Sequence, residues 1–151
     1  MTSDHHCNLF TDFRKKLHKD AQLHVMAGDY TFNGSDAQML AAFKGFHTIP
    51  SLFAAGNHDL FGDFASFLQR DFNYVQTVGQ CSFFFVNVFE NMSHSPSKRL
   101  VRTALQFLQS EIEKDSSKHK FIVVHYPIYS TGYFGSSPML TFEMEKFLDL
   151  H

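Results

Sequence analysis

The chain has 151 residues, 44% of them hydrophobic, and a formal net charge of −2 with its histidines neutral. This length fits about one domain with one sizeable core, so we expect a single domain over residues 1–151. The charge balance gives no sign of a nucleic-acid-binding surface, and no apolar stretch approaches the roughly 20 residues of a membrane span.

Three apolar runs each end in residues of the kind that bind metal ions. In chain order, they are Leu23–Ala27 before Gly28-Asp29, Ile49–Ala55 before Gly56-Asn57-His58-Asp59, and Phe121–Val124 before His125. Short runs of this kind predict parallel strands that are covered on both faces. Because ligands bind beyond the carboxyl ends of such strands, we expect these polar side chains to converge.

Helices are predicted between the strands. Apolar residues at helical spacing predict helices over residues 9–17, 35–46, 64–68 and 100–114. Ser137 and Pro138 supply an N-cap and a first-turn proline for a last helix through Leu148. Residues Ser82–Phe89 are aromatic and β-branched on both faces, which predicts a further buried strand. The alternation of strands and helices predicts an α/β fold.

Loops and cysteines complete the local predictions. Turn-forming residues predict loops at 91–97 and 130–137, and the second loop is placed to wall a site beside His125. Cys7 and Cys81 lie outside any CxxC pair, so we expect two free, buried thiols, with a disulfide as the alternative. Residues 1–20 show no apolar segment of the kind found in a signal peptide.

The polar clusters have the chemistry of a cation site. The side chains of Asp4 and His6 point to the same side of an extended segment, so they can bind one ion together. Gly28 allows the sharp turn that brings Asp29 close to the other clusters. The Asp29 carboxylate can bridge two ions through its two oxygens. Taken singly, each cluster is also typical of an ordinary turn or a frayed terminus. Their order along the chain favours a shared site.

This series of motifs resembles the calcineurin-like metallophosphoesterase superfamily, whose pattern reads D-x-H, GD, GNH[DE], a strand-end His and G-H-x-H. The resemblance implies an α-β-β-α sandwich with mixed sheets. The segment from His125 to Gly132 further resembles the purple and tartrate-resistant acid phosphatase branch. The matching motifs here are Asp4-x-His6, Gly28-Asp29, Gly56-Asn57-His58-Asp59 and Ile122-Val123-Val124-His125.

The resemblance also implies a metal-dependent phosphoesterase with two metal ions, for which Fe, Zn, Mn, Mg and Co all suit the mixed ligands. A hydroxide activated by both ions attacks phosphorus, and Asp29 bridges the ions. His58 assists the leaving oxygen and, with Asn57, contacts the substrate, while Asp59 is expected to orient the His58 ring. The implied metal ligands are Asp4, His6, Asp29, Asn57 and His125.

The sequence departs from the family pattern. It contains no G-H-x-H motif, and no strand precedes Asp4, so we expect a domain truncated at both ends and a weak or inactive catalyst whose complete parent is active. Phe32 stands where the acid phosphatase branch carries Tyr, which argues against an iron–tyrosinate centre. The alternative function is a non-catalytic remnant or a scaffold or binding protein. A nuclease is disfavoured because no basic stripe is present. Oligomeric state, localisation and the particular phosphate ester are not predicted.

Overall fold

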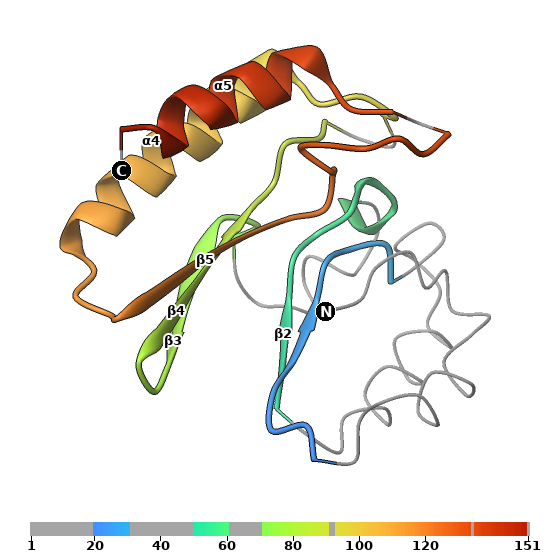
Figure 1. Ribbon diagram of the computed structural model, residues 1–151. Coiled ribbons are helices and arrows are strands. Elements are labelled where there is room, and N and C mark those ends of the chain that lie inside the picture. Colours follow the sequence, from blue (N-terminus) through green and yellow to red (C-terminus); the bar gives the residue numbers. More distant parts are fainter. Residues whose placement is uncertain (1–19, 31–49, 61–70, 91–92, 134, 151) are drawn as a thin grey trace.

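The computed structural model describes residues 20–30, 50–60, 71–90, 93–133 and 135–150 (Figure 1). The helices predicted over residues 9–17, 35–46 and 64–68 lie outside these ranges. The described elements are, in order, β1 (His24–Met26), β2 (Ser51–Phe53), the 3-10 helix η1 (Asn57–Leu60), β3 (Tyr74–Val78), β4 (Cys81–Val86), α4 (Lys98–Lys114), β5 (His119–Val124) and α5 (Pro138–Leu148).

The described strands form two sheets. Strands β1 and β2 pair in parallel, with Val25 opposite Leu52. The other sheet has the order β3-β4-β5. In it β5 runs parallel to β4, with Phe84 opposite Ile122, and β3 runs antiparallel to β4. Three strands predicted as parallel, β1, β2 and β5, lie in parallel pairs, and β4 was predicted as a buried strand without a direction, whereas β3 was not predicted. It reaches β4 through a tight turn in which Gly79 has a φ of 61°.

Alternating side chains of β4 place the mixed sheet between two layers. Phe84 and Val86 pack into the core cluster that includes Leu108 of α4 and Leu140 of α5. Phe85 packs on the opposite side, in a cluster with Ala27, Ala54 and Val123. Figure 1 shows the two helices on one face of this sheet and β1 and β2 on the other. The mixed α/β architecture with two sheets is therefore confirmed.

The two helices form where the sequence predicted them. In α4 the buried residues Val101, Ala104 and Leu108 recur at helical spacing and face the sheet. In α5 the side chain of Ser137 accepts a hydrogen bond from the backbone N–H of Leu140 at 3.3 Å, with Pro138 as the first helical residue. Neither described helix is long and apolar enough to cross a bilayer.

Two burial predictions were wrong in part. The first half of β5 is exposed: Phe121 is 46% exposed and stacks on Phe83 with ring centroids 5.1 Å apart. β5 lies at the end of the strand order in the described sheet, and only its second half, around Val123, is covered. Cys81 is free, as predicted, but only half-buried, because it begins β4 beside the turn; Cys7 lies outside the described residues.

Candidate functional site

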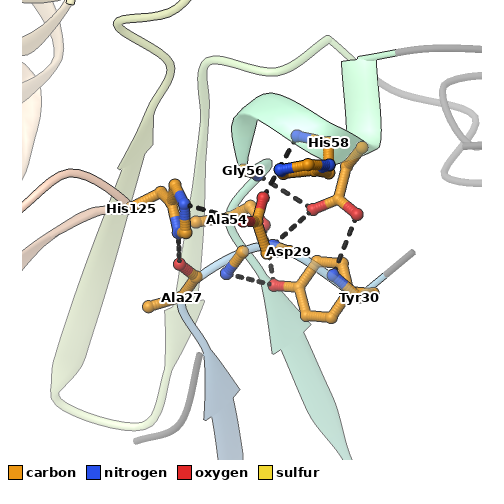
Figure 2. Close-up of polar contacts among 9 residues, drawn as sticks. Ala27, Asp29, Tyr30, Ala54, Gly56, His58 and His125 are labelled. Atoms are coloured by element: carbon orange, nitrogen blue, oxygen red, sulfur yellow. Dashed lines mark hydrogen bonds and ion pairs between the residues drawn. The ribbon is translucent and has the colours of Figure 1, made fainter. Parts of the chain in front are cut away.

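Three strand ends deliver predicted site residues to one place. Asp29 follows β1, Asn57 and His58 begin η1 just after β2, and His125 follows β5. Figure 2 shows the Asp29 carboxylate between the side chains of His58 and His125. Its Oδ2 lies 3.3 Å from His125 Nε2, and its Oδ1 accepts the backbone N–H of His58 at 3.1 Å. Asp29, His58 and His125 therefore converge, and Asn57 lines the same cavity.

Two glycines allow the turns after β1 and β2 to touch. A Cβ on Gly28 would lie 2.7 Å from the backbone N of Gly56 and 2.7 Å from His125 Nδ1. A Cβ on Gly56 would lie 2.1 Å from Asp29 Oδ1. Gly28 also has a φ of 97°, which side chains disfavour. Only glycine at both positions lets Asp29 approach so closely.

Asp59 ties the two turns together. Its buried carboxylate accepts the backbone N–H groups of Asp29 at 2.7 Å, Tyr30 at 2.9 Å and Gly56 at 2.9 Å. Charge-assisted bonds of this kind are stronger than neutral ones. Asp59 therefore positions the backbone that carries Asp29, and its orientation of the His58 ring stays a prediction.

Tyr30 is a second buried link between the strands. Its hydroxyl lies 2.7 Å from the carbonyl oxygens of both Met26 and Ala54 and accepts the N–H of Gly28 at 3.0 Å. Burial, and then the charge of Asp59, raise the pKa of the Tyr30 hydroxyl well above its usual value. The hydroxyl thus stays protonated and can donate to one of the two carbonyls.

The environment of His125 fits a metal ligand. With Nδ1 protonated, the ring donates to the carbonyl oxygen of Ala27 at 2.7 Å, and Nε2 lies 3.3 Å from Asp29 Oδ2, to which it donates when the ring is charged. Ligating histidines typically donate their other ring nitrogen in this way. A cation that takes the place of the Nε2 proton would be shared by this imidazole nitrogen and the carboxylate oxygen that faces it.

The charge of Asp29 suits the same role. Burial raises the pKa of its carboxyl, but the hydrogen bond and charge of His125, followed by the backbone N–H of His58, outweigh burial and lower it. The carboxyl is therefore ionised at neutral pH although it is only 3% exposed. A buried anion beside an imidazole nitrogen is an attractive environment for a cation.

A cavity of about 290 Å³ opens beside these groups. It is lined by Asp29, Asn57, His58, Phe89, His94, His125, Tyr126, Pro127, Ser130, Gly132, Tyr133 and Gly135. The loop predicted at residues 130–137 thus contributes a wall. A larger groove of about 520 Å³, lined by residues of α4 and α5, contains none of the predicted site residues.

The described residues hold only part of the predicted ligand set. Asp4 and His6 lie outside the described ranges. Within those ranges, no group of three or more His, Cys, Asp or Glu side chains is arranged to hold a metal ion. The described donors are one carboxylate, one imidazole and the Asn57 amide, which is 5% exposed.

Sequence reasoning missed two residues of the cavity. His94 lines it, with its ring centroid 6.5 Å from that of His58. Phe89 packs between His125 and Tyr126, with 5.7 Å between ring centroids in each pair. No local signal marks His94, which is a single histidine in a serine-rich loop. Phe89 was predicted only as part of a strand.

Comparison with models of protein families identifies a related family. A family model described as calcineurin-like phosphoesterase matches residues 1–151. The matched region contains the turns after β1 and β2, together with His125. A search of curated proteins found no match.

Proposed function

Because the chain belongs to the calcineurin-like phosphoesterase family, we propose that it is a metal-dependent hydrolase of phosphate esters. The observation that carries the proposal is the pairing of Asp29 with His125 at 3.3 Å, beside a cavity of about 290 Å³. We also propose that residues 1–151 belong to one such domain. The sequence from His125 to Gly132 supports a further proposal, that the chain belongs to the acid phosphatase branch, and Tyr126, Pro127 and Ser130 of this segment line the cavity.

The ligand roles follow from the donor atoms. Asp29, Asn57 and His125 would hold one cation, and Asp29 would share a second cation with Asp4 and His6. Fe, Zn, Mn, Mg and Co remain the candidate metals, since all accept mixed nitrogen and oxygen ligands. When bound, such ions supply Lewis acidity and a nucleophilic hydroxide at neutral pH.

The protein's own groups orient the ester and its leaving oxygen. The backbone N–H of His58 is fixed on Asp29 Oδ1 at 3.1 Å, so its half-buried imidazole is held at the cavity. An imidazole within hydrogen-bond reach of a leaving oxygen can donate a proton to it from a ring nitrogen. The Asn57 amide at the same cavity can contact the phosphoryl group.

The proposal is tested by metal content and turnover of the 151-residue chain. We expect metal to co-purify and p-nitrophenyl phosphate to be hydrolysed slowly, with the activity lost on addition of a chelator. Asp29→Asn removes the ionised carboxylate and should lower both metal retention and turnover by about 10- to 100-fold or more. The matched control Asp71→Asn changes an exposed carboxylate outside the cavity and should leave both unchanged.

Two outcomes would argue against the proposal in different ways. Hydrolysis that survives the chelator or Asp29→Asn would contradict the metal-dependent mechanism. Metal binding without any hydrolysis would favour the alternative, a binding protein that keeps the fold.

A further inference from the structure

His94 and His58 lie on the same cavity, with ring centroids 6.5 Å apart and ring planes inclined at 56°. We propose that His94 is a second imidazole that binds the phosphoryl group of the substrate together with His58. This inference rests on the proposed function and deepens it, because it assigns a substrate-binding residue outside the family motifs quoted above.

The base of the segment that carries His94 is anchored by hydrogen bonds. The side chain of Asn87 bonds both the N–H and the carbonyl of Phe89, at 3.1 Å each. At the other end, Ser97 donates its N–H to Val88 at 2.7 Å and its hydroxyl to Glu90 at 2.7 Å. The two ends of the segment are therefore held next to each other, at the start of α4.

A local turn then presents His94 itself. The hydroxyl of Ser93 accepts the N–H of Ser95 at 3.2 Å and lies 2.9 Å from the Ser95 carbonyl, to which it donates. His94 is the central residue of this turn. Its side chain is thereby placed at the mouth of the cavity, where it is exposed to solvent and accessible to a ligand.

The described lining of the cavity offers neutral hydrogen-bond donors, rather than basic side chains, to a phosphoryl group. Among its described lining residues there is no Lys or Arg, so imidazole, amide and hydroxyl groups provide the side-chain hydrogen bonds to a phosphoryl group. The carboxylate of Asp29 repels an anion at its own side. With 6.5 Å between their ring centroids, His58 and His94 can each direct a ring nitrogen at one phosphoryl group.

The test measures inorganic phosphate binding by titration calorimetry, in the presence and absence of Mn²⁺. His94→Ala should weaken phosphate binding about tenfold, since a hydrogen bond to a charged group is lost. His94→Gln keeps an N–H donor, so its affinity should lie between those of His94→Ala and the unaltered chain. The control His119→Ala removes an exposed histidine that does not line the cavity and should bind phosphate normally.

Thermal unfolding of each variant accompanies the titrations. We expect unchanged midpoints, because the His94 side chain is exposed. Equal affinity in His94→Ala and the unaltered chain, or an equal loss in His119→Ala, would overturn the inference alone. If the unaltered chain binds no phosphate even with Mn²⁺, both the inference and the proposed function are contradicted.

Discussion

Asp29 adopts a φ of 56°, a conformation that non-glycine residues rarely take and that costs about 1–3 kcal/mol. The surrounding contacts compensate for this strain. Its N–H is bonded to Asp59, and its carboxylate contacts His125 and the N–H of His58. The strained residue is also the one that faces the cavity, which is typical of functional sites.

Gly28 and Gly79 both have a positive φ, but only Gly28 lies in close contact with other residues, so alanine at the two positions distinguishes backbone strain from steric clash. Gly28→Ala adds a Cβ at 2.7 Å from both Gly56 and His125, whereas Gly79→Ala adds one with open space around it. We expect Gly79→Ala to cost about 1–2 kcal/mol in free energy of unfolding, and Gly28→Ala about 3 kcal/mol or more. Urea denaturation of both variants measures this. Equal losses would show that the close contact between the two turns is absent.

The residues that carry local signals were predicted from the sequence, and the others were not. Asp29, Asn57 and His125 each follow an apolar run, so their placement at strand ends is a local property. The role of Asp59 depends on backbone groups about 30 residues away, at Asp29 and Tyr30, which no spacing rule contains. The position of His94 depends in the same way on how its loop meets η1.

At the scale of elements, β3 joins the two sheets. The hydroxyl of Tyr74 donates to the carbonyl of Phe53 in β2, and its ring stacks on Phe85 of β4 with centroids 4.5 Å apart. The second half of β3 is exposed to solvent. Its sequence includes the polar residues Gln76 and Thr77, so it is not a continuous apolar run like those that predicted the other strands. Its antiparallel pairing is set by the tight turn at Gly79, a tertiary arrangement that the search for apolar runs could not detect.

The end of α4 is fastened to the mixed sheet by Asp115. Its carboxylate accepts the hydroxyl of Ser82 in β4 at 2.8 Å and that of Ser117, and it pairs with Lys120 of β5 at 3.3 Å. The hydrogen bond from Ser117 is the main cause of a pKa below the ordinary value of 3.8. Burial opposes this shift, and the bonds from Ser82 and Lys120 add to it.

The pH dependence of stability tests this connection. Because the pKa of Asp115 is lower in the folded state, its contribution is present above pH 3.8 and is lost as the pH falls through the folded pKa. Asp115→Asn should therefore lower the unfolding midpoint at pH 7, and the difference from the unaltered chain should shrink below pH 3.8. Asp71→Asn, an exposed control, should show no such difference. A gap that stays constant down to pH 2 would contradict the assignment.

For the whole molecule, the three described layers bring the ends of β1, β2 and β5 to one cavity. The α/β class followed from alternating strand and helix patterns, and the helices α4 and α5 formed close to their predicted bounds. Burial was predicted less well, because the covering of a strand depends on which elements pack over it. Phe121 shows this, since it belongs to an apolar run and is nevertheless 46% exposed.

The proposed site depends on Asp29 and His125 sharing a cation. Anomalous diffraction from crystals grown with Zn²⁺ would show whether they do. We expect an anomalous peak at about 2.0–2.2 Å from both Asp29 Oδ2 and His125 Nε2. Well-ordered crystals in which zinc binds only elsewhere, with Asp29 and His125 in direct contact, would contradict it.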